Sequence, residues 1–151
     1  MRKLSTIVLS LLCLLMTACS NEFARTEYDS DEKISETADR YAKEVSVGNS
    51  TNQNYSLTVK KFNGRETLWK KTLKENQNIE VNISFRLSNG QAKIVHIDKD
   101  DNITTVMECS PDASTDGFVT KTLSLKSGKN RLKLVGYDCE NIDLKFEYKG
   151  E

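Results

Sequence analysis

Residues 79–87 read IEVNISFRL, and every second one of them is apolar. Successive side chains of a strand point to opposite faces, so this pattern is typical of a strand with one buried and one wet face. Asn89-Gly90 follows directly, and both central positions of a type I′ hairpin turn need the positive φ that Asn and Gly tolerate. The stretch therefore predicts a half-buried strand that ends in a hairpin turn.

The period of two continues through the rest of the chain from Asn54 onward. Turn-forming residues at Asn63-Gly64, Asp100-Asp101-Asn102 and Ser127-Gly128 interrupt it. Short runs at close spacing, with no long helical patterns between them, favour antiparallel sheets. The sequence predicts an all-β fold over residues 52–151, an antiparallel β-sandwich of jelly-roll type. Its eight expected strands are 55–62, 66–73, 79–88, 91–98, 103–109, 118–126, 131–137 and 142–148.

Composition sets limits on function. The 151 residues include 22 Lys and Arg against 22 Asp and Glu, so no charge excess indicates a nucleic-acid partner. One His leaves little material for imidazole chemistry, and the chain has no Gly-rich phosphate loop, HExxH or GxSxG. We therefore expect neither an enzyme nor a cofactor.

The first 18 residues, MRKLSTIVLSLLCLLMTA, join a basic start to an apolar run from Thr6 to Met16. A membrane-spanning helix needs about 20 apolar residues, so the run is too short to span a bilayer. Residues 1–18 are therefore expected to be a signal peptide that is removed. Residues 16–19, MTAC, resemble the lipobox of bacterial lipoproteins.

The lipobox resemblance implies that the Cys19 thiol receives a diacylglyceryl group and that the signal is cut before this residue. The new amine can also be acylated, and two or three acyl chains, palmitate among them, give stable anchoring. The implied location is extracytoplasmic, anchored by lipid to the bacterial cell membrane or outer membrane. The alternative is a plain secretory signal, with Cys19 as an ordinary thiol.

Two segments are expected between Cys19 and the sandwich. Residues 19–30 are mostly polar and predict a flexible tether. Residues 31–47 carry apolar side chains at helical spacing after a capping Ser30 or Asp31, which predicts a short amphipathic helix. This helix either docks on the body or belongs to a partly disordered spacer, and a partner-binding helix is the alternative. GNSTNQ at 48–53 marks the expected boundary.

The body contains two cysteines, Cys109 and Cys139. Two thiols in an oxidising compartment predict a disulfide between them. The alternatives are two free buried thiols, or a metal-binding or redox role for the pair. The wide spacing without a CxxC motif argues against a metal or redox site.

The other polar candidates have ordinary interpretations. Asp98, Asp100 and Asn102 alternate like calcium-loop ligands, but Ile103 occupies the position of the required Gly. We expect a solvated hairpin turn there, with a weak irregular Ca²⁺ site as the alternative, and predict no metal site. His96 has no catalytic partner motif and is expected to be an ordinary strand residue.

Residues 117–137 contain five cationic side chains and no acidic one. Alternation places Leu123, Leu125, Leu132 and Leu134 inward and leaves Lys126, Arg131 and Lys133 on the wet face. A solvated face is the simple interpretation, and contact with an anionic envelope polymer or lipid head groups is the alternative. Nucleic acid is not expected, since interleaved aromatic residues are absent.

Trp69 and Tyr137 are the aromatic residues that could bind a ligand by stacking. Trp69 lies among Lys70, Lys71 and Lys74, and Tyr137 lies at the end of an expected strand. Packing in the core or at a sheet edge is the alternative for both.

Residues 122–148 read TLSLKSGKNRLKLVGYDCENIDLKFEY. Two Leu-x-Leu pairs flank Gly128-Lys129-Asn130, and Asn141-Ile142-Asp143 follows. The pattern resembles the closing strands of galactose-binding-like and family 6 carbohydrate-binding sandwiches, and this resemblance implies a sandwich that binds sugar. We expect a lipid-anchored, non-catalytic binding or envelope-interaction module, with envelope polysaccharide or a surface protein as candidate partner. The alternatives are a structural subunit of a surface complex and, less favoured, a small envelope hydrolase.

Overall fold

The computed structural model describes residues 22–51 and 54–149. The predicted signal peptide and Cys19 lie outside the described residues. Within them, no helix is both long and apolar enough to cross a membrane. The elements in chain order are a helical stretch at 22–28, α2 (Asp31–Ser35), β1 (Arg40–Ser50), β2 (Asn54–Leu73), β3 (Gln77–Arg86), β4 (Asn89–Ile97), β5 (Ile103–Cys109), the 3-10 turn η1 (Pro111–Ala113), β6 (Val119–Leu125) and β7 (Gly128–Lys149).

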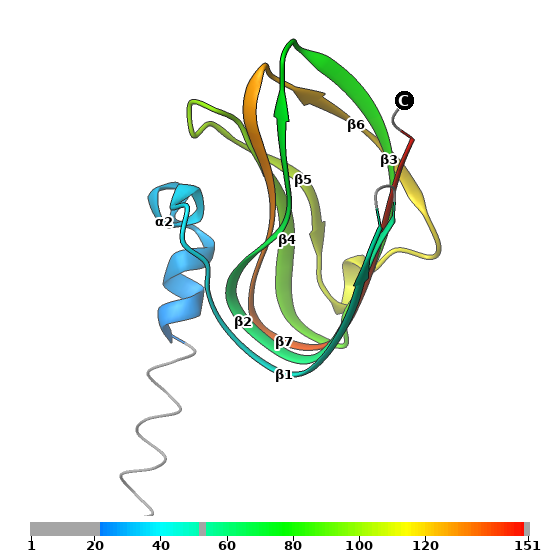
Figure 1. Cartoon of the computed structure of the whole chain (residues 1–151). Helices are drawn as coiled ribbons and strands as arrows, with labels where there is room; N and C mark the ends of the chain where they lie inside the picture. Colours follow the sequence, from blue (N-terminus) through cyan, green and yellow to red (C-terminus); the bar gives the residue numbers. More distant parts are fainter. Residues whose placement is uncertain (1–21, 52–53, 150–151) are drawn as a thin grey trace, which may run out of the picture.

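All strand pairs are antiparallel, and they join into one sheet with the order β1-β2-β7-β3-β6. β4 pairs with the first half of β7 and with β5, whereas β3 pairs with the second half of β7. β2 runs alongside almost the whole of β7. The two long strands therefore belong to both halves of the sheet, and their bend folds the halves over one another as the two layers of a sandwich (Figure 1). The predicted all-β antiparallel fold is confirmed.

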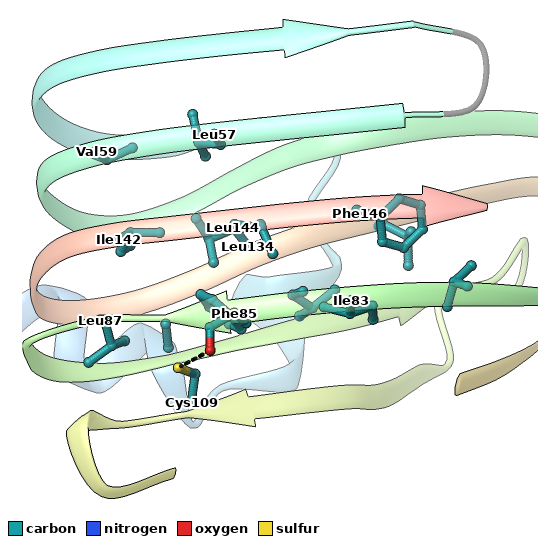
Figure 2. Packing of buried hydrophobic residues seen from close by; sticks show 14 of the residues in the cluster. Leu57, Val59, Ile83, Phe85, Leu87, Cys109, Leu134, Ile142, Leu144 and Phe146 are labelled. Atoms are coloured by element: carbon teal, nitrogen blue, oxygen red, sulfur yellow. Dashed lines mark hydrogen bonds between the residues drawn. The ribbon is translucent and has the colours of Figure 1, made fainter. Parts of the chain in front are cut away.

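The main core fills the space between the two layers. Ile83 and Phe85 of β3 are fully buried, and they belong to the same cluster as Leu134 and Leu144 of β7 (Figure 2). Each side chain of this size contributes about 1.5–3 kcal/mol when it is fully removed from water. The four leucines expected to point inward are all buried, namely Leu123, Leu125, Leu132 and Leu134.

Two of the predicted turns are bulges inside continuous strands. β2 contains both the 55–62 and 66–73 runs, and β7 contains both of the last two. The register of β2 against β7 shifts between Phe62 and Gly64, while Asp138 has a φ of 53° and Asn141 a φ of 51°. A bulge bends a strand and increases its twist without ending it. The expected eight strands are consequently six, and β1 makes the seventh.

The predicted hairpin at Asn89-Gly90 is wrong, because β3 and β4 do not pair with each other. The chain crosses here from one layer to the other. Gly90 has a φ of 83° and lies close to β7, so that an added Cβ would be 2.4 Å from the backbone of Asp138. Ser127-Gly128 likewise joins β6 to β7, which are not neighbours. The Asp100-Asp101-Asn102 turn does close a hairpin, between β4 and β5.

The predicted helix over 31–47 is also wrong beyond its first turn. Ser30 does cap α2 by accepting a hydrogen bond from the Lys33 amide, but α2 ends at Ser35. From Arg40 onward the chain is β1, whose backbone pairs with β2. A helix with so few apolar side chains gains little from packing, whereas strand pairing satisfies the backbone. Residues 48–50 are the last residues of β1, and they pair with the start of β2, so β1 belongs to the same sheet as the body.

The described part of the predicted tether is docked on the body. Residues 22–28 are helical, and Tyr28 and Ile34 pack against Val95, Ile97 and Val135 in a second apolar cluster. This cluster lies on the side of β4 and β7 that faces away from the main core, which we call the outer face. We call residues 22–39 the N-terminal segment, and it covers the outer face (Figure 1).

Candidate functional site: a polar groove at the bend of the sheet

A groove of about 820 Å³ lies where β1, β2, β4 and β7 bend, beside the N-terminal segment. We call it the polar groove, because most of its lining is polar side chain. Its lining residues are Arg25, Ala42, Lys43, Glu44, Lys61, Asn63, Asn89, Gly90, Gln91, Tyr137, Asp138, Cys139 and Glu140.

Bulges create this groove and orient its amide side chains. The bulged backbone leaves amides and carbonyls without partners in the regular ladder, and side chains take their place. Asn63 Oδ1 accepts a hydrogen bond from the Asp138 amide at 2.8 Å. Asn89 Nδ2 donates to the Asp138 carbonyl at 3.3 Å. Both side chains are therefore held in place by the strand that they line.

Tyr137 is the aromatic residue of the polar groove. Its ring contacts Tyr28 edge-on, with 5.2 Å between centroids, and the Arg25 guanidinium lies 4.9 Å from its centroid. Arg25 also reaches Asp138 at 3.4 Å. Burial is the main cause that raises the pKa of Tyr28 above its ordinary value, so Tyr28 stays neutral beside Tyr137.

The charges of the polar groove balance. Three cationic side chains line it, those of Arg25, Lys43 and Lys61, and so do three acidic ones. Glu44 pairs with Lys61 at 3.4 Å, as Asp138 does with Arg25. A surface with alternating charges and amides presents many hydrogen-bonding groups without the net potential that attracts a polyion. Such a groove suits a neutral ligand rich in hydroxyl groups.

Trp69 does not share this site. It packs with the main core between the layers, and its ring meets Tyr148 edge-on at 6.2 Å. The cavity beside it measures about 20 Å³. A space of that size holds about one water molecule, which excludes a sugar ring. Because Tyr137 packs with the outer cluster, the sheet separates the two aromatic residues predicted to bind ligand.

The predicted Cys109–Cys139 disulfide is a further correction, since both thiols are free and buried. Cys109 pairs with Ala92 of β4, and Ala92 pairs in turn with Gly136 of β7. A whole strand lies between the two cysteine-bearing strands, and strands two apart are about 9.6 Å from each other, too far for a disulfide. The Cys109 thiol instead donates to the Phe85 carbonyl at 3.3 Å (Figure 2), and the Cys139 thiol to the Gln91 carbonyl at 3.1 Å.

The predicted wet cationic face is mostly buried. Lys126 is exposed and pairs with Asp98 at 2.6 Å, but Arg131 is 8% exposed and Lys133 is fully buried. As predicted from alternation, Arg131 and Lys133 lie on the outer face of the sheet. They are buried because the N-terminal segment covers that face. The Lys133 ammonium donates to the Glu36 carbonyl and lies 3.3 Å from Asp39. Burial lowers its pKa, against the opposing effect of Asp39.

Asp98 stabilises the turn that follows β4. Asp98 accepts hydrogen bonds from the backbone amides of Asp100 and Asn102. Burial would raise its pKa, but Lys126 and these amides hold the pKa well below 3.8. Among the described residues, no group of three His, Cys, Asp or Glu could hold a metal ion. His96, within β4, lies 2.9 Å from Asn130 Oδ1 and is buried with it.

Sequence reasoning missed most of the polar groove. Of its lining residues only Tyr137 and Cys139 were singled out, the latter for a disulfide. Asn63, Asn89 and Gly90 did carry a signal, because they occur as Asn-Gly pairs, but the pairs mark bulges here. Nothing in the sequence indicated that β1 and the N-terminal segment would reach the same place.

No protein-family model matches this chain, and no curated protein matches it. Several solved structures of carbohydrate-binding β-sandwiches are similar to it. A mutant of a family 29 carbohydrate-binding module has a TM-score of 0.41 and 13% sequence identity, covering 74% of this chain and 73% of that one. A family 35 carbohydrate-binding module from an environmental isolate has a TM-score of 0.40 and 16% identity, covering 74% and 77%.

Proposed function

We propose that this chain is a non-catalytic binding module that holds a glycan in the polar groove. The observation that carries the proposal is the groove's balanced charge together with amide side chains fixed by the bulges. Sugar hydroxyls are neutral donors and acceptors, and pre-oriented amides and carboxylates bind them without reorganising. Tyr137 supplies the aromatic ring on which the apolar side of a sugar packs. The similar solved structures are carbohydrate-binding modules, which agrees with this proposal.

The experiment is a glycan array followed by titration of the full chain with any saturating ligand. Tyr137→Ala removes the ring, and Gln91→Ala removes an exposed amide of the groove. Truncation of a true anchor costs about 2 kcal/mol or more, roughly thirtyfold in affinity. Phe118→Ala is the matched control, because Phe118 is 49% exposed and outside the groove. Absence of saturable binding, or equal losses in the control, would contradict the proposal.

We also propose that Cys19 is lipidated and holds the module at a membrane. Residue 22 belongs to the docked N-terminal segment, and two residues, 20 and 21, separate it from Cys19 in the sequence. The three peptide steps from Cys19 to residue 22 span at most about 11 Å, so a lipid on Cys19 would hold the body close to the membrane surface. Replacing Cys19 with Ala should move the protein from the membrane fraction to the soluble fraction. Intact-mass analysis that finds an unmodified Cys19 in the mature protein would refute this proposal.

A second candidate function, binding of a protein partner, has one specific observation in its favour. β1 lies at an edge of the sheet, and its Val45 and Val47 are 72% and 71% exposed. A long edge strand with exposed apolar residues is a template for strand addition by another chain. Size-exclusion chromatography and cross-linking of Val47→Lys against the wild type test it. A complex that survives Val47→Lys unchanged would argue against β1 as the interface.

A further inference from the structure

A second cavity lies at the far end of the sheet, about 360 Å³ in volume. We call it the basic pocket. It lies between the ends of β2 and β7, the turn after β4 and the end of the N-terminal segment. Its lining residues are Thr37, Lys70, Lys71, Thr72, Asp98, Lys99, Asp101, Lys129, Asn130 and Arg131.

Strand register brings the cationic side chains of the basic pocket together. Lys70 lies directly opposite Arg131, and Thr72 lies opposite Lys129. All four residues are at alternate positions, so they share the outer face with Lys133. Two like charges placed directly opposite one another destabilise a sheet. A cluster of this kind has a cost unless an anion is bound to it.

The acidic residues nearby neutralise only part of the cluster. Lys99 pairs with Asp100 at 2.7 Å. Asp98 is occupied by Lys126 at 2.6 Å. Asp101 pairs with one nitrogen of Arg131, Nη2, at 2.6 Å. Among the described residues, no carboxylate pairs with Lys70 or Lys129. The lining has five cationic side chains against two acidic ones, in contrast to the balanced polar groove.

Arg131 has a donor left over. Only 8% of the residue is exposed, and its Nη1 nitrogen is buried with no hydrogen-bond partner among the described residues. A buried donor without an acceptor is costly, and it is rare in folded proteins. Nη1 has almost no accessible surface and Nη2 is paired with Asp101, so Arg131 acts on an anion in the basic pocket chiefly through its positive charge.

We propose that the basic pocket binds a tetrahedral oxyanion, phosphate or sulfate, either free or as an ester on a larger molecule. Lys70 and Lys129 contribute exposed ammonium groups, and Arg131 contributes positive charge from the neighbouring position. Thr37 and Thr72 add hydroxyl groups to the lining. This site is separate from the polar groove, and it does not depend on a glycan binding there.

The test is calorimetric titration of the full chain with inorganic phosphate and with sulfate, and with chloride as the control for ionic strength. Glucose 6-phosphate provides the ester arm. We expect saturable binding of at least one of these oxyanions that weakens as salt is added, because the contact is largely electrostatic. A tighter fit for glucose 6-phosphate than for inorganic phosphate assigns the site to esters, and the reverse assigns it to the free ion.

The variant Lys70→Ala/Lys129→Ala removes two exposed lysines and should fold, which circular dichroism checks. It should lose affinity at least tenfold, since a hydrogen bond to a charged group is worth about one such factor. Lys121→Ala removes an exposed lysine of β6 outside the pocket and should bind like the wild type. No saturable binding, an unchanged double variant, or an equal loss in Lys121→Ala overturns the proposal. Tyr137→Ala leaves this binding intact, so failure of the glycan proposal is separately visible.

Discussion

Arg65 and Glu27 form an ion pair at 3.5 Å, with both side chains only 3% exposed. Arg65 comes from β2 and Glu27 from the N-terminal segment, so the pair fastens that segment to the sheet. Arg65 also donates to Glu36 and to the Ala38 carbonyl. The outer face of the sheet is therefore covered by a layer of buried charge in addition to the apolar cluster.

Removing Arg65 should be among the most damaging substitutions. Arg65→Ala leaves the Glu27 carboxylate buried without its cation, and breaking a buried pair in this way costs about 3–5 kcal/mol. Urea denaturation measures the loss. Arg86→Ala is the matched control, since Arg86 is exposed and should change the free energy of unfolding by about 0.5 kcal/mol or less. Equal effects in both variants would contradict the buried arrangement.

The N-terminal segment should behave as part of the fold. Ile34 is fully buried, so Ile34→Ala creates a cavity and should destabilise by about 2–5 kcal/mol. Val47→Ala shortens a β-branched side chain that is 71% exposed, and should be nearly neutral. If both variants unfold at the same urea concentration, the segment is not docked as described.

Gly64 should tolerate no side chain. Its φ is 109°, and an added Cβ would lie 2.2 Å from the Arg40 carbonyl oxygen. Gly117 has a similar φ of 90° but nothing within 4 Å of an added Cβ. Gly117→Ala should therefore cost about 1 kcal/mol for its φ alone, and Gly64→Ala clearly more, because the backbone of β1 must also move. Thermal unfolding of the two variants compares these costs, and a Gly64→Ala no worse than Gly117→Ala would refute the contact.

Stability should fall at alkaline pH because of Cys139. Burial, as the main cause, raises the pKa of this thiol from 9.0 to about 12. Between those values the unfolded chain releases the proton and the folded chain keeps it, so the unfolded state becomes favoured as pH rises. At pH 10.5 the loss is about 2 kcal/mol. Urea denaturation under reducing conditions measures the free energy of unfolding from pH 8 to 10.5. This free energy should fall less steeply with pH for Cys139→Ala than for the wild type, and parallel pH dependences would contradict the prediction.

Both body thiols should be free in the isolated protein. Alkylation in denaturant without prior reduction, followed by peptide mapping, should label Cys109 and Cys139 fully. A linked peptide pair would show that β4 is not interposed between their strands.

The sequence predicts the body of this fold well where alternation is strict. Residues 79–86 of the opening stretch lie in β3, and the apolar residues of 79–87 are all buried as expected. Alternation reports which residues share a face, but it does not report whether a Gly-containing interruption ends a strand. Asn63-Gly64 and Asn89-Gly90 look like hairpin turns and are bulges, because tertiary pairing with β7 decides between the two.

Other errors arise from partners far away in the chain. The prediction of a wet cationic face is wrong because residues 22–39 cover Lys133, and no local sequence pattern encodes that contact. The predicted helix is replaced by a strand from Arg40 onward, because β2 offers an edge with which this part of the chain pairs. The candidate site was predicted only through Tyr137. Apart from Arg25 of the N-terminal segment, the remaining lining comes from the bends of four strands, whose alignment is a property of the whole sheet.

The place of β7 has a consequence for how the chain is made. This strand comes after the six other described strands in the chain, yet it pairs with β2, β3 and β4 and lies at the centre of the sheet. Until synthesis reaches it, the earlier strands lack their shared neighbour and β2 has only β1 beside it. Such non-local pairing makes folding slow and leaves partly made chains exposed. The sheet is therefore expected to form only after β7 has been synthesised, in a late step that begins when β7 inserts between its neighbours.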